Sequence, residues 1–198
     1  MTSRPAGVTS TVYSVPAKRS IVMPYRYRVN APRSLVWNQL VHLEQIYTQT
    51  SPAHLFFRVR GGGPLCAVAV IDCEETVEGE HVRHVFKMDH FMPRKMIAYT
   101  SEDSVTTTSG GQKFHSKVHC SFVLEDANSQ ESATDIDFSV IVVLPSRIHR
   151  MVARMLGTEA IWKPHIVEES LGFARLMDRM SPTRTVSETH GPAQDDGS

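Results

Sequence analysis

The sequence lacks an excess of charge of either sign. Its 198 residues contain 21 Lys plus Arg and 21 Asp plus Glu, so the formal net charge at neutral pH is zero. Proteins that bind nucleic acid normally present a basic surface. The only long stretch without acidic residues precedes Glu44, and its basic residues are too dilute to form a phosphate-binding arm. We therefore expect no nucleic-acid partner.

Long hydrophobic runs are also missing, and cysteine is scarce. No apolar run approaches the ~20 residues needed to cross a bilayer, and residues 1–20 contain no hydrophobic stretch of a secretory signal. The three cysteines, Cys66, Cys73 and Cys120, form no CxxC pair, and each lies in an apolar stretch. The cysteine usage predicts buried thiols in a reducing compartment and hence a cytoplasmic protein. The lack of a spanning run predicts that the membrane is not a partner.

Apolar residues make up 41% of the chain, which is enough for one sizeable core. Residues 1–20 and 181–198 are polar, rich in Pro, Gly and Ser, and show no hydrophobic period. Such segments cannot bury enough apolar surface to offset the entropy lost on ordering. The sequence therefore predicts two disordered tails around a single domain, residues 21–180.

Hydrophobic periods predict the order of the elements within this domain. Residues 21–29 alternate as a half-buried strand does, and residues 36–47 carry an apolar stripe of helical spacing. Residues 146–180 are helical in character, and Pro164 either kinks one long helix or begins a second one. Between these segments we expect six strands separated by turns, at 55–60, 65–77, 81–92, 95–101, 113–124 and 134–144. The order predicts an α+β fold, in which a curved antiparallel sheet wraps around a long C-terminal helix.

This order of elements resembles the helix-grip fold of the Bet v 1 and START-like proteins. The segment YRVNAPRSLVW resembles the first strand and first helix of that superfamily. The resemblance covers residues 21–180 and implies an internal apolar cavity between the sheet and the long helix. Such a cavity predicts an apolar or aromatic small molecule as the partner.

The C-terminal helix carries the first candidate site. Residues spaced by four from Ile161 to Met177 share one helix face, and they include His165 and Glu169. Burying a carboxylate without a partner costs several kcal/mol, whereas a His and a carboxylate four residues apart can both bind one metal ion. A solvated His–Glu pair and an internal ion pair with an arginine are the alternatives. Glu168 lies near the same face, so the identity of the acid is open.

Three further residues belong to the candidate site. Glu75 shares the apolar phase of the strand 65–77 and is predicted to point inward, unless it is a solvated strand end; Glu74 takes the opposite phase. His54 precedes an apolar strand and, taken alone, is an ordinary loop histidine. His90 lies on the more apolar phase of 81–92, where it is either a general acid or base or a hydrogen-bonded core or rim residue.

Together these residues resemble the phloretin hydrolase and 2,4-diacetylphloroglucinol hydrolase family. The motifs are Tyr47 followed by Pro52-Ala53-His54, a Glu75 in CEETVEG, and PHIVEESLGFARLM near the C-terminus. The resemblance implies a catalytic zinc bound by His54, Glu75, His165 and Glu169. Two histidines and two carboxylates also suit Mn²⁺ or Fe²⁺.

The same resemblance implies a zinc-dependent hydrolase that cleaves a carbon–carbon bond next to a carbonyl. The substrate is then an aryl ketone or a polyketide-derived ketone. Tyr47 would donate a hydrogen bond to a phenolic oxygen, and His90 would shuttle a proton. A metal-free polyketide cyclase or aromatase and a non-catalytic carrier of an apolar ligand need the cavity without the four ligands. The sequence leaves open whether the chain is a monomer or a homodimer.

Overall fold

The computed structural model describes residues 16, 18–108, 110–127, 132–155 and 157–181. The expected tails therefore lie mostly outside the described residues. The strands are β1 Ser20–Val29, β2 His54–Val59, β3 Val70–Val77, β4 Glu80–Met92, β5 Met96–Thr107, β6 Lys113–Asp126 and β7 Thr134–Val143. The helices are α1 Arg33–Val41, α2 Leu43–Thr50, α3 Arg147–Met155 and α4 Thr158–Met180.

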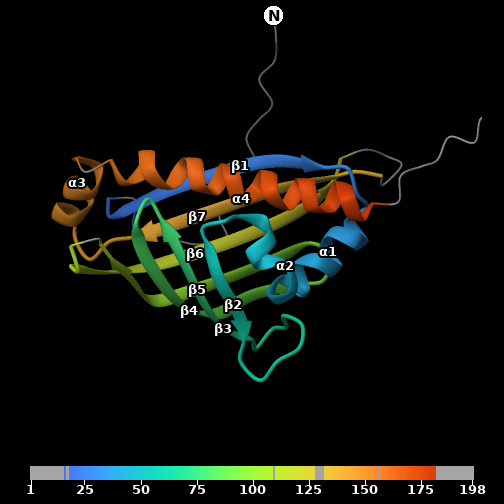
Figure 1. Cartoon of the computed structure of the whole chain (residues 1–198), viewed down its shortest axis with the longest axis horizontal. Coiled ribbons are helices and arrows are strands. Elements are labelled where there is room, and N and C mark those ends of the chain that lie inside the picture. The colour runs from blue at the N-terminus through green and yellow to red at the C-terminus, as the bar shows by residue number, and fades with distance from the viewer. Residues whose placement is uncertain (1–15, 17, 109, 128–131, 156, 182–198) are drawn as a thin grey trace, which may run out of the picture.

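The seven strands form a single antiparallel sheet in the order β1-β7-β6-β5-β4-β3-β2. Figure 1 shows the sheet curving behind α4, with α1 and α2 together near one end of the long helix. Alternation along the strands explains the arrangement, since Ile136, Phe138 and Val140 of β7 are all buried. The expected α+β fold, with a curved sheet wrapped around a long C-terminal helix, is confirmed.

Two helix boundaries differ from the expectation. The apolar stripe over 36–47 belongs to two helices, because the chain breaks at His42 between α1 and α2. In the C-terminal region the break falls at Gly157, whose φ of 71° is left-handed, a conformation that glycine adopts without steric cost. Pro164 lies inside α4 and neither begins nor ends it.

The strand expected over 65–77 begins only at Val70. The segment before it is a loop, in which Leu65 donates its backbone N–H to the carbonyl of Val41. Cys66 lies in this loop and is exposed, so the expectation that it is buried was wrong. Its apolar neighbours made the segment resemble a strand, although the loop packs only Leu65 and Ala69 inward.

A cavity of about 680 Å³ lies between the inner face of the sheet and α4, and it extends to α3. Its walls are mostly apolar, with aromatic side chains from the sheet and Trp162 from α4. The helices that the structure describes include none that is long and apolar enough to cross a membrane.

α4 approaches the end of α2 very closely at Gly172. A Cβ atom added there would lie 1.7 Å from the backbone oxygen of Thr50. Only glycine fits at this position, because the obstacle is backbone and cannot rotate away. The contact fixes Thr50, the last residue of α2, directly against the helix that carries His165 and Glu169.

Candidate metal centre

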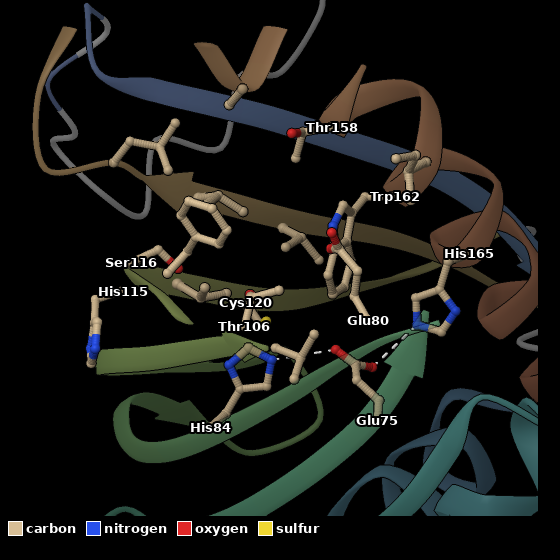
Figure 2. A pocket seen from close by; sticks show the side chains of 18 of the residues that line it. Glu75, Glu80, His84, Thr106, His115, Ser116, Cys120, Thr158, Trp162 and His165 are labelled. Carbon is tan, nitrogen blue, oxygen red and sulfur yellow. Dashed lines mark hydrogen bonds and ion pairs between the residues drawn. The ribbon is translucent and has the colours of Figure 1, made fainter. Parts of the chain in front are cut away.

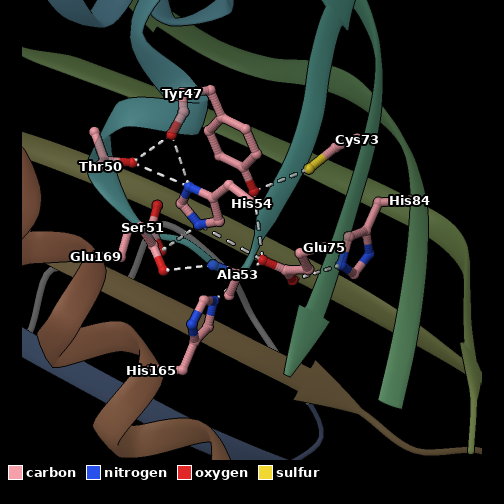
Figure 3. Close-up of polar contacts among 10 residues, drawn as sticks. All are labelled: Tyr47, Thr50, Ser51, Ala53, His54, Cys73, Glu75, His84, His165 and Glu169. Carbon is pink, nitrogen blue, oxygen red and sulfur yellow. Dashed lines mark hydrogen bonds and ion pairs between the residues drawn. The ribbon is translucent and has the colours of Figure 1, made fainter. Parts of the chain in front are cut away.

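The four residues proposed as ligands meet at one place beneath α4 (Figure 3). His54 is the first residue of β2, Glu75 lies in β3, and His165 and Glu169 lie one turn apart on α4. Ligand atoms of His54, Glu75 and His165 all lie within 4.8 Å of one another, and all three residues are buried. The structure thus brings together residues from opposite ends of the folded domain.

Strand pairing accounts for the placement of the first two ligands. β2 and β3 pair in a register that sets His54 opposite Glu75. Adjacent side chains of a strand point to opposite faces, so Glu75 faces the cavity. Glu74 faces away and interacts with His81 and Arg83 on the outer surface. The structure therefore places Glu75, and not Glu74, at the centre.

Glu75 lies at the middle of the cluster. Its Oε2 is 3.2 Å from Nε2 of His165 and 3.8 Å from Nε2 of His54. Oε2 of Glu169 lies 3.9 Å from the same nitrogen of His54. Glu168 is exposed, so Glu169 is the acid of α4 that faces the site.

His54 is held in one orientation by α2. Its Nδ1 lies 2.9 Å from the backbone oxygen of Tyr47 and 3.0 Å from Oγ1 of Thr50. A carbonyl oxygen can only accept, so Nδ1 carries a hydrogen, and in the neutral form of the imidazole Nε2 keeps a free lone pair. The imidazole also stacks on the Tyr47 ring, with ring centroids 3.7 Å apart and planes 2° from parallel.

The Nε2 atom of His54 gives the clearest support for a cation site. Nε2 of His54 is buried and has no hydrogen-bond partner among the described residues. Buried polar atoms nearly always have a partner, and this one faces the carboxylates of Glu75 and Glu169. The clustered donor atoms of His54, Glu75 and His165, together with Glu169 at 3.9 Å from His54, form a set of nitrogen and oxygen donors that could hold a divalent metal.

The two carboxylates differ in their electrostatics. Burial opposes ionisation of Glu75, but hydrogen bonds from His165 and His84 outweigh burial and hold the pKa of Glu75 below its usual range. Burial raises the pKa of Glu169, and the nearby His54 and His165 compensate only in part. Glu75 is buried and Glu169 is half-buried, and both carboxylates lie near His54, so a divalent cation bound between them would balance their negative charge.

His84 completes the surroundings of Glu75 and was not expected there. Its Nε2 lies 3.3 Å from Oε1 of Glu75, and its Nδ1 lies 2.7 Å from Oγ of Ser104. Because β3 and β4 pair Cys73 with His84, the side chain lies beside Glu75 on the inner face. One pattern in the sequence could have indicated this position. Alternation along the strand puts His84 on the same face as the apolar residues Val82 and Phe86.

Of the two residues expected to act on the substrate, the structure places Tyr47 at the candidate site and His90 on the surface. Tyr47 is buried, and its hydroxyl lies 3.2 Å from Sγ of Cys73 and 3.4 Å from Oε2 of Glu75. Burial raises the pKa of Tyr47, so the phenol remains a proton donor. His90 is exposed and is not among the described residues that line the cavity. A register shift between Met88 and His90 interrupts the alternation on which its inward orientation was predicted.

The candidate metal centre occupies one region of the cavity wall, and other polar residues lie elsewhere on it. Figure 2 shows Glu75 near His165, with His84 beside Glu75 and with His115 and Ser116 farther along the cavity. An occupant of this mostly apolar cavity would therefore be largely apolar, with a few polar groups.

No family model matches the sequence, and no curated protein matches it. Solved structures do match. The Zhui aromatase/cyclase from Streptomyces sp. R1128 is 15% identical, with a TM-score of 0.62, over 81% of this chain and 94% of the other. A protein from Thermus thermophilus is 12% identical, with a TM-score of 0.63, over 81% and 99%. A START superfamily protein from Mycobacterium smegmatis is 12% identical, with a TM-score of 0.55, over 81% and 99%.

At these identities a match in structure shows the fold and does not show the activity. These matches give no support for the phloretin hydrolase family in particular, so that finer resemblance rests on the motifs of the sequence alone. The matches agree with the element order, the sheet and the long C-terminal helix described above. The chain has the helix-grip fold of the Bet v 1 and START proteins.

Proposed function

We propose that the chain is a metal-dependent hydrolase that cleaves a carbon–carbon bond next to a carbonyl. Its substrate would be an aryl ketone or another polyketide-derived ketone, held in the apolar cavity. The observation that carries this proposal is the unpartnered, buried Nε2 of His54, which faces the carboxylates of Glu75 and Glu169. A carrier of apolar ligands would have no use for this costly arrangement.

The residues that would hold the metal are His54, Glu75, His165 and Glu169. Two nitrogen and two oxygen donors suit zinc, and also Mn²⁺ or Fe²⁺. When bound, zinc supplies Lewis acidity toward a carbonyl oxygen and lowers the pKa of a water ligand.

The protein's own residues would orient the substrate and exclude water. The Tyr47 hydroxyl can donate a hydrogen bond to a phenolic or enolic oxygen placed near Glu75, because burial keeps the phenol protonated. His84 and Ser104 would hold Glu75 in place from the side of β4. His90 has no part in this proposal, since its side chain is exposed.

The first experiment measures metal in protein purified without a chelator or an affinity tag. We expect about one zinc ion per chain, because the four candidate ligands lie at a single place. The double variant His165→Ala with Glu169→Ala should lose this metal and the hydrolysis of acylphloroglucinol test substrates. Glu168→Ala changes the exposed neighbour on the same helix and should retain both. Metal-free wild-type protein, or full metal content in the double variant, would contradict the proposal.

A metal-free polyketide cyclase or aromatase is the second candidate. The observation that favours it is the structural similarity to the Zhui aromatase/cyclase, together with a cavity large enough for a folded polyketide. The two functions differ in their need for metal. Cyclisation of a poly-β-ketone that continues after dialysis against a chelator would support the cyclase and exclude the hydrolase mechanism.

A further inference from the structure

The helix α3 is unusual because none of its residues, 147–155, is buried. Four of its apolar side chains are strongly exposed, at 68% for Ile148, 57% for Met151, 43% for Val152 and 79% for Met155. Large apolar side chains that gather on one exposed surface mark an interaction site more often than chance exposure.

The exposed side chains of α3 fall into two neighbouring stripes. At 100° per residue, the four apolar side chains share one arc of the helix. Arg147, Arg150 and Arg154 share the adjacent arc, and Lys18 lies beside them in a shallow surface groove. The helix contains no acidic residue. α3 is therefore an amphipathic helix with a basic flank.

The apolar stripe is continuous with the mouth of the cavity. Ile148 and Val152 line the cavity and are also exposed outside it. Phe114, at the start of β6, also lines the cavity and is 48% exposed, and its neighbour Lys113 is exposed as well. The cavity thus opens through an apolar rim with basic residues on both sides.

We propose that α3 and Phe114 dock onto the surface of an anionic lipid bilayer, from which an apolar molecule enters the cavity. Amphipathic helices with basic residues beside an apolar face lie in the membrane interface, with the apolar side among the acyl chains. Arginines near the surface are attracted by anionic headgroups. This proposal does not depend on the metal centre or on the chemistry that it performs.

Lipid explains the rim better than an acidic protein does. An acidic partner would pair with the arginines, but it would cover the cavity mouth. In a bilayer, the acyl chains would contact the apolar stripe of α3 and the anionic headgroups would contact its arginines. A bilayer also dissolves the apolar molecules that fit the cavity. No membrane partner was expected because the sequence has no apolar run long enough to cross a bilayer, but a helix that lies on the membrane surface needs no such run.

The test is co-sedimentation of the full chain with vesicles of phosphatidylcholine, with and without phosphatidylglycerol. We expect binding to the anionic vesicles only, weakened by salt because the Debye length shortens to about 3 Å at 1 M. The variant Met151→Gln with Met155→Gln should lose most of this binding. Val68→Gln, which removes an equally exposed apolar side chain (86%) far from the rim, should bind like the unmodified protein.

The basic flank is tested in the same assay. Each arginine near an anionic surface contributes roughly fivefold in partitioning, so Arg147→Gln with Arg154→Gln should lower binding about 30-fold. Arg58→Gln with Lys87→Gln removes the same charge from exposed positions on β2 and β4 and should have little effect. All these sites are exposed, so the variants should fold, which circular dichroism verifies.

Three outcomes would overturn the proposal. The first is equal binding to neutral and anionic vesicles, and the second is unchanged binding of the methionine variant. The third is the absence of vesicle binding together with salt-sensitive binding to an acidic protein, which would assign α3 to protein docking.

Discussion

The imidazole of His54 shows how one side chain can be prepared for a ligand by its neighbours. The Tyr47 carbonyl and the Thr50 hydroxyl fix the hydrogen on Nδ1, and the Tyr47 ring fixes the ring plane. Partners of this kind orient metal-binding histidines in known sites. The stacking and the hydrogen bonds together leave Nε2 directed toward Glu75 before any cation is present.

The variant Glu75→Gln tests whether the carboxylate of Glu75 is a metal ligand. It keeps the shape of the side chain and removes the charge that would balance a divalent ion. Mutation of a residue that only hydrogen-bonds to a metal ligand typically lowers metal affinity or activity 10–100-fold. Glu75 is proposed as a direct ligand, so Glu75→Gln should lower zinc affinity by at least roughly that factor. Isothermal titration with zinc measures the change.

The neighbouring residue supplies the control. Glu74→Gln removes the same charge on the opposite face of β3, where Glu74 contacts only surface residues. Its zinc affinity should match that of the unmodified protein, and stability should change by about 0.5 kcal/mol or less. Equal affinity in the two variants would remove Glu75 from the site.

At the scale of elements, α4 combines the roles of core helix and ligand carrier. Phe173, Leu176 and Met177 are buried against the sheet, while His165 and Glu169 face the centre. Gly172 permits the close contact with the carbonyl of Thr50. The contacts that pack α4 into the core therefore also fix the positions of His165 and Glu169.

The substitution Gly172→Ala should destabilise the protein, contrary to helix propensity. Alanine in a helix is favoured over glycine by about 1 kcal/mol, but overpacking against a rigid neighbour costs about 1–3 kcal/mol or more. We expect a net loss of about 2 kcal/mol in urea denaturation, with weaker zinc binding because Thr50 and His54 are displaced. Ala160→Gly, at an exposed site of α4, isolates the propensity effect. Greater stability in Gly172→Ala would show that the contact is loose.

Local patterns could predict a large part of this centre. Helical spacing placed His165 and Glu169 on one face, and strand alternation pointed Glu75 inward. The role of His84 depends on the pairing of β3 with β4, and the exposure of His90 depends on an irregularity between β4 and β5. Pairing and bulges are set by contacts between distant segments, which no single stretch of sequence determines.

For the whole molecule, metal binding should appear as stability. A ligand that binds only the folded state stabilises it by about 2.7 kcal/mol at 100 times its Kd. In a domain of this size, that corresponds to a rise in Tm of roughly 5–10 °C. Thermal unfolding with zinc, and then with excess chelator, measures the shift. Glu75→Gln should show a clearly smaller rise because its zinc affinity is lower, and a rise of equal size in that variant would place the metal elsewhere.

The distribution of the ligands along the chain has a consequence for synthesis. His54 and Glu75 lie in the first half of the sequence, whereas His165 and Glu169 lie on the last described helix. A ribosome therefore releases two ligands long before the other two exist, and a nascent chain that ends before α4 has only half of the centre. In the proposed centre, capture of the ion would coincide with closure of α4 over the sheet, so bound metal would distinguish chains that contain α4 from chains interrupted before it.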